Sequence, residues 1–190
     1  PYRYGNKIYF SAGRDPDGGA HFKSLYEYDF ETGEQLALAD IQKKNDDIFK
    51  AQVNGNWIVY LDHKRAGGGE IRVLDRSQNS LSTVKTYYSG MPTIVLEGDL
   101  LAWMERTGTN MDKVFLYDLR NRENMTAAML ERSVFGQSDV DICESEVVWA
   151  DADPYAPREQ TDQQAVINSL SLLPSTEAKK VQSYAPNTHV

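Results

Sequence analysis

One pattern recurs four times along this chain of 190 residues and restricts the folds that it can adopt. A short hydrophobic run that ends in an aromatic residue appears as NKIYF, NWIVY, LLAW and EVVW. The final aromatics are Phe10, Tyr60, Trp103 and Trp149, at spacings of 50, 43 and 46 residues. A second strand-like run follows each of them after a polar stretch. Such a period predicts propeller blades or a similar β array, because one repeat cannot bury its apolar faces alone.

Each repeat divides into four short strands, so we predict an all-β chain, a β-propeller of four-stranded antiparallel blades. Gly5-Asn6 and Gly55-Asn56 are typical of tight turns between the first and second strands. The blades are expected at about 1–41, 48–87, 91–131 and 138–183, within a single propeller domain or fragment of residues 1–190. Residues 185–190 match the first strand of a further blade. We therefore expect a fragment of a larger ring; the alternative is that this last strand completes a closure.

Three of the four repeats carry an aspartate at the end of the third strand. Asp29, Asp75 and Asp118 are spaced 46 and 43 residues apart. Aspartate favours local bonds to backbone N–H groups in turns. One copy per blade would lie far from the next around a ring, so we predict that these aspartates stabilise turns and do not form a shared site.

Composition excludes several classes of partner. The net charge of −8 argues against nucleic acid, which requires clustered Lys and Arg. The apolar stretches are only as long as strands, so we predict no membrane insertion within this chain. Cys143 is the single cysteine, which excludes an internal disulfide. No cofactor is expected.

The loops between the second and third strands are the best candidates for a binding surface. They cover 11–24, 62–70, 105–113 and 150–165, differ from one another, and should project from one face of a propeller. Variable loops on a rigid scaffold commonly carry function. We predict ligand contacts at residues in these loops: Asp15, Asp17, His21, His63, Arg106 and Tyr155.

Metal and catalytic sites find weaker support in the sequence. Asp15 and Asp17 precede glycine as in calcium loops, but further ligand positions of that motif are missing. The three histidines, His21, His63 and His189, lie in different repeats and would have to converge to bind zinc or manganese. The run of three glycines at 67–69 is interpreted as a hairpin tip. From the missing calcium-ligand positions and the scattered histidines we predict no metal site. The sequence also contains no G-x-S-x-G motif of serine hydrolases, so we predict no catalysis by this chain.

The repeats resemble those of the TolB-like propellers, the six-bladed group that includes prolyl-oligopeptidase-type propellers. The resemblance rests on KIYFSAG with LYEYDFETGE, and on KVFLYDLRNRE. It covers nearly the whole chain; the fourth repeat departs most, with Ser171 in the aspartate position and a long insertion. It implies relatives among periplasmic and cell-surface binding proteins, peptidase propeller domains and oligogalacturonide lyases.

These observations together predict a non-catalytic binding or scaffold module that presents a loop face to a protein, peptide or glycan ligand. The resemblance implies an extracytoplasmic location, periplasmic or at the cell surface. The alternative is the substrate-gating propeller of a larger hydrolase whose catalytic domain lies outside this chain. An incomplete ring would expose unpaired faces between blades, which favours a homodimer.

Overall fold

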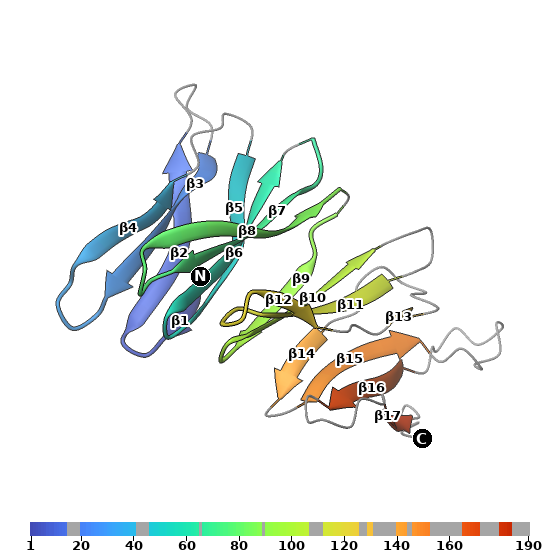
Figure 1. Cartoon of the computed structure of the whole chain (residues 1–190). Coiled ribbons are helices and arrows are strands. Elements are labelled where there is room, and N and C mark those ends of the chain that lie inside the picture. Colours follow the sequence, from blue (N-terminus) through green and yellow to red (C-terminus); the bar gives the residue numbers. More distant parts are fainter. Residues whose placement is uncertain are drawn as a thin grey trace, which may run out of the picture. The chain divides into compact units, whose positions relative to one another are not determined.

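The protein is built from antiparallel β-sheets that follow one another along the chain (Figure 1). The computed structural model describes residues 1–14, 20–40, 46–64, 66–88, 90–106, 112–125, 129–130, 140–143, 146–152, 165–171 and 179–183. No helix occurs within these ranges. The predicted all-β fold of successive four-stranded sheets is confirmed.

Within each sheet the strands lie side by side in sequence order, apart from one additional short strand in the third sheet. The first sheet contains β1 (Tyr2–Tyr4), β2 (Lys7–Arg14), β3 (Ala20–Asp29) and β4 (Gln35–Asp40). The second contains β5 (Asp46–Asn54), β6 (Trp57–Lys64), β7 (Gly69–Asp75) and β8 (Ser80–Tyr87). The third contains β9 (Thr93–Glu97), β10 (Leu100–Arg106), β11 (Asp112–Asp118), β12 (Glu123–Met125) and β13 (Met129–Leu130), which also pairs with β11. The fourth contains β14 (Val140–Cys143), β15 (Glu146–Ala152), β16 (Ala165–Ser171) and β17 (Lys179–Ser183).

The chain divides into two compact units, Pro1–Met91 and Pro92–Val190, each with two sheets. A single propeller domain of residues 1–190 remains a prediction. The further blade expected at 185–190 lies outside the described residues.

The recurring aromatic residue occupies the same place in all four sheets, the fourth position of the second strand. Tyr60 is 2% exposed and belongs to the buried cluster of Pro1–Met91, and Trp149 belongs to that of Pro92–Val190. Trp103 is also buried. Phe10 differs from these three residues. Its side chain is half-buried, and Tyr9, on the opposite face of β2, enters the buried cluster instead.

The two hairpins at one end of each of the first three sheets are joined by the same backbone hydrogen bond. The N–H of Phe30 donates to the carbonyl of Asn6 at 3.0 Å. Equivalent bonds run from Arg76 to Asn56 and from Leu119 to Asp99, both at 2.8 Å. Gly5 and Gly55 have φ of 58° and 52° in the first hairpin, a region that glycine enters without strain. The turn residues therefore fix both the hairpins and the contact between them.

The three repeated aspartates act within these turns, which confirms the structural interpretation. Oδ1 of Asp29 accepts the N–H groups of residues 31 and 32, at 2.9 and 3.3 Å. Oδ1 of Asp75 accepts those of residues 77 and 78, at 3.0 and 3.2 Å. Oδ1 of Asp118 accepts that of Asn121 at 2.9 Å. These hydrogen bonds satisfy donors that would otherwise face the turn unpaired.

The outermost strand is irregular in the first, second and fourth sheets. One residue of the outer strand has no partner residue on the neighbouring strand, and the pairing register shifts at that point. The extra residues are Leu38 in β4, Val84 in β8 and Val181 in β17. An extra residue of this kind bends a strand and increases its twist.

Candidate binding surface at the loop end of the first two sheets

The two sheets of Pro1–Met91 have distinct ends. At the loop end, β2 passes to β3, β4 to β5 and β6 to β7 (Figure 1). At the turn end lie the short hairpins, including Gly5-Asn6 and Gly55-Asn56. The strands reach further into the loop end than the sequence suggests, because β6 continues to Lys64 and β7 begins at Gly69. The interpretation of the three glycines as a hairpin tip is confirmed, since Lys64 N–H bonds the carbonyl of Gly68 at 2.9 Å.

The structure describes the side chain of one of the six predicted contact residues. His63 lies at the loop end of β6. Asp15, Asp17 and Tyr155 lie outside the described residues. His21 lies in β3 and Arg106 at the end of β10. The structure describes the backbone of these two residues but not their side chains. Contact by these six residues with one ligand remains a prediction.

His63 is held in place by two other rings. Its Nδ1 is 3.1 Å from the hydroxyl of Tyr87, and the two rings stack with centroids 6.0 Å apart and planes 11° from parallel. The ring of Phe49 meets His63 edge-on at a centroid distance of 6.0 Å. Aromatic contacts of both kinds are favourable. The imidazole is therefore a positioned, half-buried group.

The glycine turn lets the chain after β8 pass very close to this cluster. A Cβ on Gly68 would lie 2.6 Å from the carbonyl oxygen of Tyr87 and 3.1 Å from Cα of Tyr88, and its φ is +75°. A Cβ on Gly69 would lie 2.6 Å from the Tyr87 hydroxyl. A side chain at Gly68 would press on the backbone of Tyr87 and Tyr88, and one at Gly69 on the carbonyl of Asp62 and the ring of Tyr87. Tyr88 follows directly, and its side chain is 89% exposed.

We call Phe49, His63, Tyr87 and Tyr88 the loop-end aromatic cluster. Phe49, His63 and Tyr87 pack together, and the exposed Tyr88 follows Tyr87 directly in the chain. The sequence analysis missed Tyr87 and Tyr88, although two tyrosines before Ser89-Gly90 at a blade connection carry a usable signal. An exposed aromatic beside turn residues at the loop end is a candidate contact, since it offers a large amphipathic side chain.

A polar network occupies the other face of the second sheet near the same end. Arg72 donates to Oε2 of Glu70 at 2.9 Å and to Oγ1 of Thr83 at 2.8 Å. Thr83 in turn donates to the same Glu70 oxygen at 3.0 Å. Arg72 lies opposite Tyr60 in the ladder, and burial raises the pKa of that phenol while the charge of Arg72 opposes the rise. This network fixes side chains within the second sheet.

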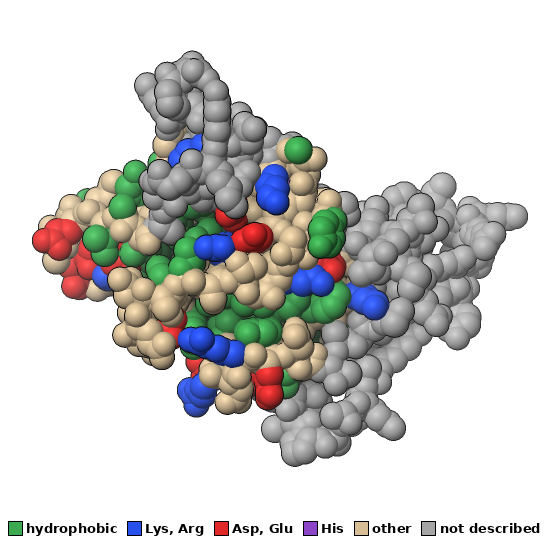
Figure 2. All heavy atoms as spheres, turned by 45° about the horizontal axis from the view of Figure 1, so that its top comes forward, with side chains coloured by type: hydrophobic (Ala, Val, Ile, Leu, Met, Phe, Trp, Pro, Cys, Tyr) green, Lys and Arg blue, Asp and Glu red, His purple; other side chains and the backbone are tan. Residues whose placement is uncertain are grey.

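Charges of both signs are mixed on the described surface. Figure 2 shows acidic, basic and hydrophobic side chains intermingled on one face, without a continuous basic field.

Within the loop-end cluster, burial raises the pKa of Tyr87 well above its usual range, and the nearby charge of Asp62 adds to the effect. Tyr87 therefore stays neutral and hydrogen-bonding at physiological pH.

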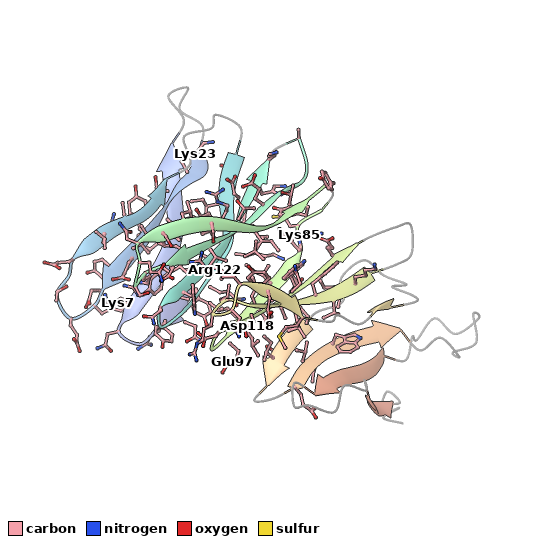
Figure 3. The ribbon with its side chains drawn as sticks, viewed as in Figure 1. Lys7, Lys23, Lys85, Glu97, Asp118 and Arg122 are labelled. Carbon is pink, nitrogen blue, oxygen red and sulfur yellow. The ribbon has the colours of Figure 1, made fainter. Side chains whose placement is uncertain are left out.

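A second cluster of titratable groups lies between the first and second sheets. Glu27, only 5% exposed, accepts a hydrogen bond from Tyr9 at 2.8 Å and one from Arg76 at 2.9 Å. Lys7 forms an ion pair with its other oxygen; Figure 3 shows Lys7 near the turn end and Lys23 near the loop end. Burial and the Glu27 hydrogen bond raise the pKa of Tyr9 to about 12. These bonds join the first and second sheets.

The described residues include no group of three or more His, Cys, Asp or Glu side chains that could hold a metal ion. Nor does that part of the chain contain a helix long and apolar enough to cross a membrane. Within the loop-end cluster, Tyr88 offers an exposed ring and phenol hydroxyl, which suit binding by stacking and hydrogen bonding.

Comparison with solved structures identifies the architecture. No family model matches the chain, and no curated protein matches it. The chain superimposes on the β-propeller domain of the Trilobed protease from Pyrococcus furiosus with a TM-score of 0.73 and 11% identity, covering 96% of this chain and 56% of that one. The four sheets of the present chain are propeller blades. The Pyrococcus horikoshii acylaminoacyl peptidase gives a TM-score of 0.68 at 11% identity, with 96% and 32% covered.

TolB from Acinetobacter baumannii matches with a TM-score of 0.61 and 11% identity, over 92% of this propeller chain and 41% of that protein. The chain thus spans between 32% and 56% of the length of these three structures. The resemblance to TolB-like and peptidase propellers, expected from the sequence motifs, is confirmed at the level of fold.

Proposed function

We propose that this propeller is a non-catalytic binding module whose loop end contacts a protein, peptide or glycan outside the cytoplasm. The observation that carries the proposal is the 89% exposure of Tyr88, which directly follows the buried Tyr87 at the loop end. Exposed aromatic anchors on rigid supports contribute strongly to recognition, because little conformational entropy is lost when they bind. The same chemistry stacks on sugar rings and on peptide side chains.

Paired substitutions at opposite ends of the sheets test the proposal. The immobilised chain would be screened against a random-peptide phage library and a glycan array, and the enriched probes would be measured by surface plasmon resonance. Tyr88→Ala is expected to weaken their binding about tenfold or more. Phe30→Ala is the control, since Phe30 is an exposed aromatic, 57% accessible, at the turn end.

Retained binding in Tyr88→Ala together with lost binding in Phe30→Ala would place the functional surface at the turn end. Failure of every probe to bind the wild-type chain at micromolar concentration would contradict a loop-end site for peptides or glycans. In the same proposal the chain hydrolyses neither peptide nor ester substrates, and turnover that survives repurification would contradict that part.

The substrate-gating propeller of a larger hydrolase is the second candidate. It is favoured by the higher TM-scores to the two peptidase structures, 0.73 and 0.68, than to TolB at 0.61. Determining the flanking reading frame tests it. A hydrolase domain with a nucleophile-elbow motif joined to this propeller would support gating, and flanks without any catalytic domain would leave the binding module.

A further inference from the structure

The first sheet presents two faces with different surroundings. One carries Tyr9, Leu25 and Glu27, which are at most 5% exposed and pack toward the second sheet; we call it the covering face. The opposite face holds side chains that are half-buried or exposed and lie outside that buried cluster. We call it the aromatic face, and its residues are Arg3, Ile8, Phe10, Tyr26 and Tyr28.

The second sheet shows what covers the equivalent face within the first unit. At the ladder positions that match the aromatic face it has three buried residues, Ile58, Tyr60 and Leu74. They share one buried cluster with Tyr9 and Leu25 of the first sheet. The covering face of the first sheet therefore packs on them.

The fourth sheet repeats this arrangement within its own unit. Val147 and Trp149 hold the positions of Ile8 and Phe10 and are buried in a second cluster. The third sheet contributes residues of its own covering face to that cluster, which are Ala102, Met104, Val114 and Leu116. In both units, a face of the aromatic-face type is covered by the opposite face of the preceding sheet.

The propeller fold continues beyond the part that this chain matches. The chain covers 56% of the solved propeller domain on which it superimposes with a TM-score of 0.73. That domain therefore contains propeller structure with no counterpart in these 190 residues. Repeated sheets bury their apolar faces by stacking on neighbours, so a further sheet of the same kind fits the aromatic face.

One side chain at the turn end sets the chemistry of that sheet. In the second sheet, the residue after the turn aspartate is Arg76, which reaches Glu27 on the covering face at 2.9 Å. In the first sheet the same position holds Phe30, which is 57% exposed and meets Tyr28 edge-on at 5.5 Å. A phenyl ring cannot pair with a buried carboxylate. The sheet that covers Phe30 therefore needs an apolar residue at the position of Glu27.

Arg3 adds a second requirement. The same ladder position holds Val53 in the second sheet and Ile142 in the fourth, which are 1% and 6% exposed. A guanidinium covered by another sheet is costly unless an acidic partner meets it. The covering sheet therefore needs an Asp or Glu at its turn end, within reach of Arg3.

We propose that the aromatic face receives the covering face of a further propeller blade, which belongs to the same polypeptide and lies outside residues 1–190. The rings are already ordered for this contact. Phe10 and Tyr26 stack with centroids 5.6 Å apart and planes 26° from parallel, so little side-chain freedom is lost when they are covered. The contact is independent of the loop-end site.

The reading frame that surrounds this chain gives the first test. We expect a further repeat with an apolar residue two positions before its turn aspartate, where the first repeat has Glu27, and with an acidic residue at the turn end of the same face. Flanks without a further repeat overturn the proposal, as does a repeat with a charged residue at the Glu27 position.

Hydroxyl-radical footprinting, read by mass spectrometry, compares this chain with the longer protein. Oxidation of Phe10, Tyr26 and Tyr28 is expected to fall severalfold in the longer protein. Leu36 is the control, because it is 56% exposed on the same sheet but pairs with Glu27 and so lies on the opposite face.

A matched pair of substitutions in the longer protein completes the test. Phe10→Lys should restore the oxidation of Tyr26 and Tyr28, whereas Leu36→Lys should leave their protection unchanged. Equal oxidation of the three wild-type rings in both proteins overturns the proposal even where a further repeat is present, and this comparison needs no substitution to fold.

Discussion

At the scale of single residues, Glu27 shows how a charge can be buried between two sheets of this chain. A carboxylate removed from water is costly unless charged and hydrogen-bonded partners replace the solvent. Tyr9, Lys7 and Arg76 supply those partners, and Arg76 comes from the second sheet. Burial opposes ionisation of Glu27, but the bonds from Lys7 and Tyr9 and the charge of Arg76 outweigh it and lower the pKa of Glu27 below its usual value.

This arrangement predicts an acid-dependent loss of stability. Because the folded-state pKa of Glu27 is lowered, its contribution is complete above the unfolded-state pKa of about 4.3 and is lost as the pH falls through the lowered value. Glu27→Gln is expected to reduce the free energy of unfolding at pH 7 by about 1–3 kcal/mol. The difference from wild type should shrink below about pH 4.

Urea unfolding at pH 7 and at pH 3 measures both effects. Glu34→Gln is the control, since Glu34 is exposed in the connection between β3 and β4 and should change stability by less than about 0.5 kcal/mol. A Glu27→Gln penalty that is equally large at both pH values would show that shape, not charge, matters at this position.

At the scale of elements, the turn after the third strand is the most regular device in the chain. In the first three sheets an aspartate accepts backbone N–H groups of its own turn, and the next residue bonds the first hairpin. The aspartate therefore recurs in the sequence because each of these turns needs an acceptor for its backbone N–H groups. Asp75 is the best buried of the three, at 5% exposed.

Asp75→Ala is expected to lower the free energy of unfolding by about 0.5–2 kcal/mol, the usual cost of losing a side-chain acceptor for backbone donors. Asp75→Asn keeps an oxygen in the same place and should retain most of the stability. Thermal unfolding followed by circular dichroism compares the three proteins. Equal melting temperatures for Ala and Asn would argue that the negative charge, not the acceptor, is the stabilising feature.

Sequence reasoning succeeded where local chemistry repeats and failed where burial depends on neighbouring sheets. Gly5-Asn6, Gly55-Asn56 and the aspartates determine turns by short-range rules, so the hairpins could be predicted. Tyr9 and Phe10 are both strand-forming aromatics, and only the packing of the second sheet decides which is buried. The pairing of His63 with Tyr87 joins residues 24 apart and has no local signature.

At the scale of the whole molecule, the chain consists of two compact units, each with a buried cluster of its own. Repeated sheets that contact mainly their neighbours have stabilities that sum from local terms, so damage in one repeat decays along the chain. Each of the two units is therefore expected to have its own free energy of local unfolding.

Leu25→Ala tests this locality. Leu25 is 0% exposed in the cluster of Pro1–Met91, and its truncation should cost about 2–5 kcal/mol. Native-state hydrogen exchange is expected to show faster opening across Pro1–Met91 and much smaller changes beyond Pro92. Uniform loss of protection over the whole chain would mean that the two units unfold as one.

The extra residues Leu38, Val84 and Val181 have a consequence for life in a crowded solution. Each lies in the strand that ends its sheet, where unpaired N–H and C=O groups could template the addition of another chain. A kinked outer strand cannot offer a straight run of donors and acceptors, so a stray extended peptide finds no continuous register to copy. A chain that repeats one strand pattern four times is at risk of edge-to-edge aggregation into fibrils. The irregular outer strands of the first, second and fourth sheets oppose such growth.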